Sequence, residues 1–206
     1  HIMIQPNPLI LNDELELKSK YGLKYIIPEA QMANPFPDGK SMIIFRSIDR
    51  TCKHIEQLSK KDARAYRKFA EWSMECLDFI VAGAYNPPPS FGTMLSELEK
   101  SEDGTELVRA MMMSLQDVMD EWFEDEHVKT LLIHYATELL LPPWENGTGS
   151  TLFIMLPIMH SYGMGCPVGG SGALAEALAK CVEDNGGKIL TSSPVKKIII
   201  KDTRAE

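Results

Sequence analysis

The feature that most limits the fold of this chain is a long region in which apolar residues follow the spacing of a helix. Clusters of prolines interrupt this region. Between residues 59 and 141, apolar side chains recur every three or four positions, which places them on one face of a helix. The first such face consists of Tyr66, Phe69, Ala70, Ser73, Leu77, Ile80 and Val81. Prolines at 87–89 and 142–143 cannot continue a helix, so the pattern predicts several helices separated by these clusters.

Residues that favour helix starts indicate where these helices begin. Ser59 stands three residues before an aspartate, Ser114 allows a helix to restart, and Asp125 begins a further apolar pattern. Another helix is expected to open at 104–105. Four methionines lie in these helices: Met111, Met112, Met113 and Met119. Because a thioether chain fills irregular shapes, they suit either an adaptable apolar pocket or plain helix core, and both interpretations stay open.

The flanking stretches predict short helices and strands. Residues 12–22 carry early acids and a final glycine, which predicts a short helix, and residues 23–27 are typical of a strand. A turn at 37–39 before an apolar stretch at 42–46 indicates a hairpin. The sequence therefore predicts an α+β fold, a helical region with a small antiparallel sheet.

The last forty residues begin with a helix bracketed by glycine pairs. Ser171 can cap a helix over 171–185, which Gly186-Gly187 would end. Residues 188–190 and 195–200 then favour two strands joined by a turn.

Composition and charge exclude several classes of protein. The chain has 206 residues and is 44% hydrophobic, which is typical of a soluble globular protein. Its 21 basic and 29 acidic residues give a net charge of −8, which argues against nucleic-acid binding. The longest mostly apolar run, 151–159, is too short for a transmembrane segment, and no secretory signal is visible. Residues 1–3 resemble a cloning remnant. The four cysteines form no C-x-x-C pair, so reduced thiols in a cytoplasmic protein are expected.

Histidines offer no clear catalytic or metal centre. His127 and His134 lie seven residues apart, whereas a helical metal site needs ligands three or four apart, so solvated or core histidines are favoured. His160 stands beside Ser161, but no third member of a nucleophilic triad is visible. The sequence thus indicates no catalytic residue and no metal ligand.

The glycines at 163–172 do not complete a nucleotide-binding fingerprint. G-x-G-x-x-G fails at Val168, and a P-loop fails because Ser171-Gly172 replaces the lysine and hydroxyl pair. Gly169 and Gly170 still allow a backbone to approach a ligand closely at a helix start.

A resemblance joins these features. The stretch 167–205 resembles the phytoene desaturase-like FAD-dependent oxidoreductases, with their P-x-G-G, L-x-x-A-L, G-G-x-I and V-x-x-I pattern. The matching residues are Pro167, Gly169, Gly170, Leu174, Ala177, Leu178, Gly186, Gly187, Ile189, Val195 and Ile198. The segment "LSKKDARAYRKF" is also similar to the one that precedes the helical substrate domain of that family.

The resemblance implies a cofactor, a substrate and their contacts. It implies FAD that exchanges a hydride with an apolar, isoprenoid-like substrate, with orientation and a dry pocket supplied by the protein. Gly169, Gly170 and Val195 match cofactor-binding positions of the family, and Tyr162 and Met164 are candidates for the substrate side of the junction.

Two FAD-binding segments of the family have no counterpart here. The chain is therefore interpreted as an internal fragment, inactive alone and not expected to hold FAD tightly. Residues 4–165 would be a substrate-binding-like domain and residues 166–206 part of the FAD domain. Self-association through residues 152–164 or through the edge at 198–200 is expected. The alternative is a self-contained helical domain that binds an apolar ligand or a protein partner without redox chemistry.

Overall fold

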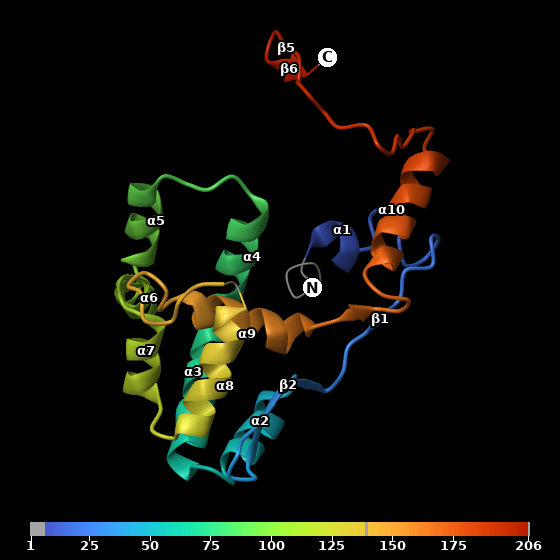
Figure 1. Cartoon of the computed structure of the whole chain (residues 1–206). Coiled ribbons are helices and arrows are strands. Elements are labelled where there is room, and N and C mark those ends of the chain that lie inside the picture. Colours follow the sequence, from blue (N-terminus) through green and yellow to red (C-terminus); the bar gives the residue numbers. More distant parts are fainter. Residues whose placement is uncertain (1–6, 139, 206) are drawn as a thin grey trace.

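A computed structural model describes residues 7–138 and 140–205, and Figure 1 shows their arrangement. The helices are α1 (Pro8–Leu11), α2 (Ile48–Ile55), α3 (Lys60–Glu75), α4 (Leu77–Tyr85), α5 (Phe91–Leu98), α6 (Glu102–Met112), α7 (Leu115–Trp122), α8 (Glu126–Thr137), α9 (Thr151–Tyr162) and α10 (Gly172–Asp184). The strands are β1 (Tyr25–Ile26), β2 (Ala30–Pro35), β3 (Ser41–Phe45), β4 (Cys166–Pro167), β5 (Ile200–Lys201) and β6 (Arg204–Ala205). The strands pair antiparallel as β1–β4, β2–β3 and β5–β6, which confirms the α+β prediction. Residues 1–3, interpreted as a cloning remnant, lie outside the described residues.

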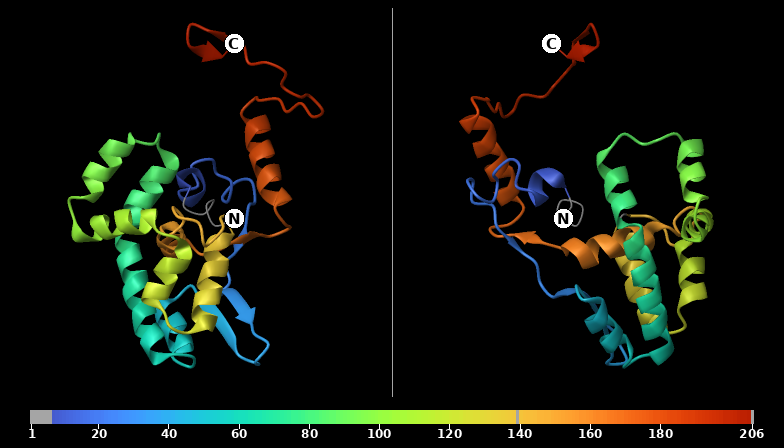
Figure 2. Two further views of the ribbon diagram at one scale, coloured as in Figure 1. Left: turned by 60° about the vertical axis from the view of Figure 1, so that its left-hand side comes forward. Right: turned by 180° about the vertical axis from the view of Figure 1, so that it is seen from behind.

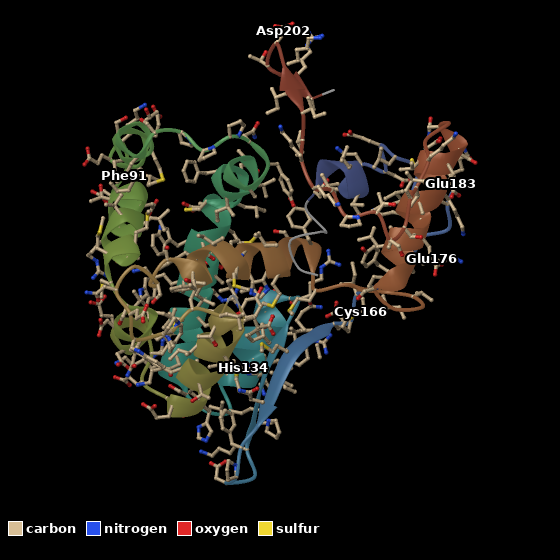
Figure 3. All side chains as sticks on the ribbon, turned by 45° about the horizontal axis from the view of Figure 1, so that its top comes forward. Phe91, His134, Cys166, Glu176, Glu183 and Asp202 are labelled. Atoms are coloured by element: carbon tan, nitrogen blue, oxygen red, sulfur yellow. The ribbon has the colours of Figure 1, made fainter. Side chains whose placement is uncertain are left out.

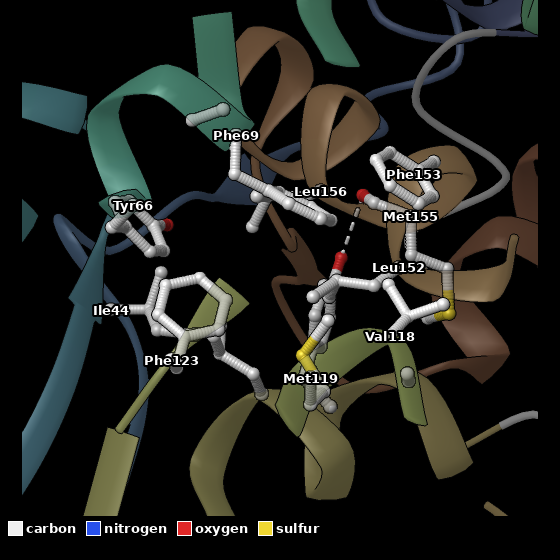
Figure 4. Close-up of a cluster of buried hydrophobic side chains, with 14 of the residues drawn as sticks. Ile44, Tyr66, Phe69, Val118, Met119, Phe123, Leu152, Phe153, Met155 and Leu156 are labelled. Atoms are coloured by element: carbon white, nitrogen blue, oxygen red, sulfur yellow. Dashed lines mark hydrogen bonds between the residues drawn. The ribbon is translucent and has the colours of Figure 1, made fainter. Parts of the chain in front are cut away.

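Helices α3, α7, α8 and α9 enclose the main hydrophobic core, and α2 with the β2–β3 hairpin covers its lower side (Figure 1). The predicted starts at Ser59, Ser114 and Asp125 are confirmed, since each side chain accepts a backbone N–H of the following turn. The close-up in Figure 4 shows Tyr66 and Phe69 from α3 meeting Phe123 and the α9 side chains. Capping and apolar periodicity therefore account for where these helices begin and which faces they bury.

Helix α9 is the most buried element of the body. The sequence indicated only an apolar segment interrupted by Pro157, yet the proline lies inside a continuous helix. Tyr135 of α8 donates its hydroxyl hydrogen to the Met155 carbonyl of α9 at 3.0 Å (Figure 4), which ties the two helices together. Most of α9 is buried, so few of its side chains are available for the self-association expected through residues 152–164, which stays a prediction. Neighbouring helices cover α9 on several sides, which a single sequence does not reveal.

Helices α4, α5 and α6 form an upper part of the body. The predicted helix face that ran from Tyr66 to Val81 is split at Cys76, where α3 ends and α4 begins. The prolines end α4 as predicted, but α5 was not predicted, and α6 begins after Ser101 rather than at 104–105. Gly104 is buried where α6 crosses the end of α5, and a Cβ there would overlap the Leu98 carbonyl oxygen.

The N-terminal segment differs from its prediction. Residues 12–22 do not form a helix, because Asp13 turns its carboxylate back onto the backbone N–H groups of Lys18 and Ser19. This local bonding competes with helix formation. The hairpin at 37–39 is confirmed, with β2 paired to β3. Strand β1, within the predicted strand 23–27, pairs instead with β4.

At the other end of the chain, α10 confirms the predicted helix over 171–185. Ala177 of α10 packs with Ile10, Leu17 and Leu23 in a small second core. Residues 188–190 do not form the predicted strand, and of 195–200 only Ile200 pairs, in the short β5–β6 hairpin. The prediction failed because no neighbouring strand lies beside these residues, and Figure 2 shows the tail extending away from the body. Within the described ranges, no helix is both long and apolar enough to cross a lipid bilayer.

Candidate functional site

An apolar pocket of about 290 Å³ lies among α4, α5, α6 and α9. Its walls include Phe79, Ile80, Met94, Leu107, Met111 and Phe153. The remaining wall residues add one hydroxyl, from Ser150, and one thiol, from Cys76. An apolar interior with so few polar groups suits the hydrocarbon part of a ligand and offers little to a charged one.

The composition of α4 explains why this pocket exists. The helix is apolar nearly all round, yet none of its residues is fully buried. Phe79 keeps 46% of its surface exposed. Gly83 and Ala84 also line the pocket, and a Cβ added at Gly83 would meet no atom within 4 Å. Small side chains therefore leave open space where a larger one would fill the pocket.

An aromatic cluster supports the back of the pocket. Phe153 stacks on Phe69 with ring centroids 4.3 Å apart and meets Trp72 edge-on at the same distance. Trp72 lies parallel to Trp122 at 6.1 Å. Because interlocked rings resist rearrangement, this wall keeps its shape while α4 and α5 form the more open side.

The methionine interpretations are both confirmed in part. Met111 lines the pocket, whereas Met119 is fully buried in the core. Met113 is half-buried against the core, and Met112 is exposed. The helical stripe therefore serves as a pocket wall at one position and as core at another.

A second hollow of about 370 Å³ adjoins the pocket between α3, α5 and α6. It shares Cys76, Phe79, Leu98 and Leu107 with the pocket wall and adds Glu75, Glu97 and Asp103. Burial raises the pKa of the Cys76 thiol, and the nearby carboxylates of Asp103 and Glu75 raise it further. The thiol is thus held protonated at the border between an apolar space and an acidic one.

Gly169 and Gly170 form an open turn between β4 and α10. Both adopt φ +91°, a left-handed conformation that suits glycine. The Gly170 N–H donates to the Pro167 carbonyl at 3.0 Å, and a Cβ added at Gly170 would meet no atom within 4 Å. A flat or anionic group could therefore approach this backbone closely.

Val195 lies at the opposite end of α10 from this turn. The helix has 13 residues and so spans about 20 Å. Val195 is 80% exposed in the extended stretch that follows the helix. The described structure therefore does not bring Val195 together with Gly169 and Gly170.

Tyr162 and Met164 lie at the junction between the helical body and α10. Tyr162 ends α9 and is half-buried, and the Met164 N–H donates to the side-chain oxygen of Gln31. Burial raises the pKa of Tyr85 at the end of α4, and Tyr162, on the contacting helix α9, raises it further. Figure 3 shows Cys166 at the same junction. Tyr162 thus links this junction to the helix that lines the pocket.

The histidines have structural partners. His160 is buried, with Nε2 2.8 Å from the Tyr66 hydroxyl and Nδ1 2.8 Å from the Arg46 carbonyl. Desolvation lowers its pKa, so the neutral ring is favoured. His127 and His134 each contact the hairpin, through Asp38 at 3.1 Å and Asn34 at 3.1 Å. In the part of the chain that the structure describes, no group of three potential metal ligands occurs.

The pocket residues of α4 and α5 escaped sequence reasoning. The sequence predicted one continuous helix face that includes Leu77 and Ile80, and the shared border of four helices cannot be read from one segment. The available signal was that α4, "LDFIVAGAY", is apolar nearly all round although it ends at an exposed proline loop. Such a helix needs a covering surface or a ligand.

Comparison with known proteins gives distant similarities. No protein-family model matches the chain. The chain is 24% identical over 209 residues to pyridine nucleotide-disulfide oxidoreductase domain-containing protein 2 from Rattus norvegicus, covering 90% of this chain and 35% of that protein. It is 21% identical over 205 residues to a 4,4'-diapophytoene desaturase from Methylomonas sp, covering 96% and 38%. It is 25% identical over 154 residues to a lycopene-forming phytoene desaturase from Pseudescherichia vulneris, covering 73% and 29%.

These matches agree with the family resemblance at a coarse level. They support a distant relationship to the superfamily of FAD-dependent oxidoreductases. The chain spans about a third of the length of the first two relatives.

Proposed function

We propose that this chain is the substrate-holding part of an FAD-dependent oxidoreductase that acts on an apolar, isoprenoid-like substrate. The observation that carries the proposal is the apolar pocket among α4, α5, α6 and α9. A hydrocarbon offers no hydrogen-bonding group, so its binding depends on burial in such a space. The similarity to proteins named as desaturases supports the same class of ligand.

The junction side chains support the direction of binding. Tyr162 lies near Tyr85, and Tyr85 follows the pocket residues Gly83 and Ala84 on α4. A chain-like substrate anchored in the pocket could extend along α4 toward Tyr162 and Met164. These two residues would then orient the reacting carbons and exclude water from them.

The glycine turn fits one edge of the proposed cofactor. Gly169 and Gly170 present backbone that a Cβ would otherwise screen, and the turn leads directly into α10. FAD, when bound, would supply hydride transfer, and the chain would supply contact and orientation. Val195 could contribute backbone hydrogen bonds in a complete FAD domain, but at about 1 kcal/mol net each these add little by themselves.

We also propose that the chain divides into a substrate-binding part and a part of the FAD domain. Residues 4–165 are assigned mainly to substrate binding and residues 166–206 to the FAD side. The segment carrying Ile10, Leu17 and Leu23 accompanies the FAD side, because these residues pack on Ala177 of α10.

The pocket can be tested with Gly83→Phe. The added ring would fill the space beside α4, so binding of a neutral aromatic probe such as N-phenyl-1-naphthylamine should fall at least tenfold, since a few buried carbons are worth about 1.4 kcal/mol or more. Gly92→Phe is the matched control, because Gly92 is also helical with free space at its Cβ but does not line the pocket. Equal binding by both variants would refute the pocket assignment.

The second candidate is a helical domain that binds an apolar ligand without redox chemistry. The pocket favours it as well, since all its walls lie within this chain. Absorbance after incubation with FAD and desalting separates the two for the product of the complete gene. Retained flavin supports the oxidoreductase, whereas a colourless protein that still binds the neutral probe supports the alternative. This chain by itself is expected to stay colourless.

A further inference from the structure

The apolar pocket borders a hollow whose charged lining is entirely acidic. Glu75 ends α3, Asp103 lies in the first turn of α6 and Glu97 lies in α5. Leu98 and Leu107 belong to the walls of both spaces, so the apolar pocket and the acidic hollow share a wall.

Two of the three carboxylates are not neutralised. Glu97 forms an ion pair with Lys100 at 2.6 Å. Among the residues that the structure describes, neither Glu75 nor Asp103 has a hydrogen bond or ion pair, and both are exposed. Farther along, Glu71 and Glu106 pair with Arg67 and Arg109, so those charges are compensated.

Helix electrostatics favours a carboxylate at Asp103 and is balanced at Glu75. An acidic side chain is favourable at the start of a helix, where the N–H groups carry partial positive charge, and Asp103 holds such a position. Glu75 is the last residue of α3, where the carbonyl groups carry partial negative charge and a cation would be favoured. It also directly precedes Cys76, the N-cap of α4, where a negative charge is favourable, so the two helix ends oppose each other at this position.

The field of both carboxylates reaches the pocket wall. Burial is the main cause of the raised pKa of Cys76, and Asp103 and Glu75 are the charged groups that add to it. A negative charge placed beside Cys76 would experience the same repulsion, because the thiolate is itself an anion at that position.

We infer that Glu75 and Asp103 make the pocket selective for uncharged hydrocarbons by repelling ligands with an anionic end, such as fatty acids or prenyl diphosphates. This inference rests on the proposed function and adds a rule of selection to it. Discrimination by repulsion needs no contact with the correct ligand, so the two carboxylates can lie outside the apolar walls.

Two probes that share one aromatic skeleton test the inference. N-Phenyl-1-naphthylamine is neutral, and 8-anilino-1-naphthalenesulfonate is the same molecule with a sulfonate. Binding of each is measured by fluorescence titration for the unaltered chain and for Glu75→Gln/Asp103→Asn. Signal that survives Gly83→Phe belongs to other surfaces and is subtracted.

The expected result is a change for the anionic probe alone. Removal of two unpaired charges that border the pocket, in a largely aqueous setting, should raise its affinity about fivefold. Affinity for the neutral probe should stay within about twofold, and added salt should reduce the difference between the chains. Glu99→Gln/Glu102→Gln is the control, since it removes the same net charge from exposed positions of the same region that do not line either space.

The outcomes separate this inference from the proposed function. If the control raises sulfonate binding as much as the double variant, or if neither does, charge selection at the pocket is wrong while the pocket stands. If the neutral probe does not bind in a Gly83-dependent way, the proposed function fails and the inference fails with it. Circular dichroism and unfolding midpoints of the variants show that they retain the fold.

Discussion

The helical body and the C-terminal segment, residues 182–205, carry similar apolar residues but differ in how far these are buried. In the body, apolar faces of α3, α7, α8 and α9 cover one another, and Phe69, Phe153 and Tyr135 are buried. Every described residue from 182 to 205 is exposed, including three consecutive isoleucines at 198–200. Similar apolar residues are therefore buried in the body, where other helices cover them, and stay exposed in the C-terminal segment, where no described element does. Four predictions test how far the two regions differ.

The largest expected effect is the loss of an aromatic core ring. Phe69→Ala should lower the free energy of unfolding by about 3–5 kcal/mol, because Phe69 is fully buried and contacts several rings. Val195→Ala in the exposed segment should change it by less than about 0.5 kcal/mol. Urea unfolding measures both. Similar losses for both variants would mean that the tail is packed in solution.

The next largest effect on stability should come from Gly104, where α6 lies close against the backbone of α5. Gly104→Ala should destabilise by about 1–3 kcal/mol, because the new methyl group would overlap the Leu98 carbonyl and push α5 from α6. Gly92→Ala should be neutral or stabilise by up to about 1 kcal/mol, since the space is free and alanine favours a helix. Thermal unfolding of the pair gives the sign of each change. A stable Gly104→Ala would show that the α5–α6 corner is looser than described.

The buried histidine should make stability depend on pH. The pKa of His160 is lowered by burial, so the unfolded chain binds more protons between the folded pKa and the usual value of about 6.5. Stability from this group is therefore present above about pH 6.5 and falls as the pH drops, by at most about 1.4 kcal/mol per pH unit. His160→Gln should be less stable at neutral pH and show a flatter profile. A parallel profile for both proteins would exclude His160 as the cause.

Substitutions in the C-terminal tail should have the smallest effect on stability. They should instead change the self-association of the chain. Ile198→Lys/Ile200→Lys should leave the free energy of unfolding within about 0.5 kcal/mol. The same change should reduce self-association, because charge on an exposed apolar edge opposes pairing. Light scattering after size exclusion measures this against Lys196→Ile as the opposite change. A strictly monomeric unaltered chain at high concentration would contradict the expected self-association.

Local signals were sufficient for the predictions that succeeded. Ser59, Ser114 and Asp125 each bond the turn that follows them, so sequence neighbours alone fix these helix starts. The predicted helix at 12–22 failed through an equally local competitor, the Asp13 carboxylate. Here the helix-like arrangement of charges and the bonding of Asp13 to the backbone favoured different structures, and the sequence pattern alone did not decide between them.

Features that depend on distant segments could not be predicted. Pro157 lies inside a helix because surrounding helices hold α9 in place. Residues 188–190 lack a neighbouring strand, although their composition favours one. The pocket combines four helices, so its residues become a set only in three dimensions. For the glycine turn, the sequence indicated the backbone freedom that the structure shows, with Gly169 and Gly170 both left-handed.

The antiparallel pairing of β1 with β4 affects how the helical body can move relative to α10. Two chain segments, rather than one, connect the helical body with α10, and they run antiparallel with Gln31 bonded to Met164 beside them. Gly163 permits this contact, since a side chain there would collide with Ile27. A single tether allows torsion, whereas two tethers fastened side by side resist torsion and leave bending as the softer motion. Bending at the β1–β4 pair would thus change the distance between the glycine turn and the pocket without rotating one relative to the other.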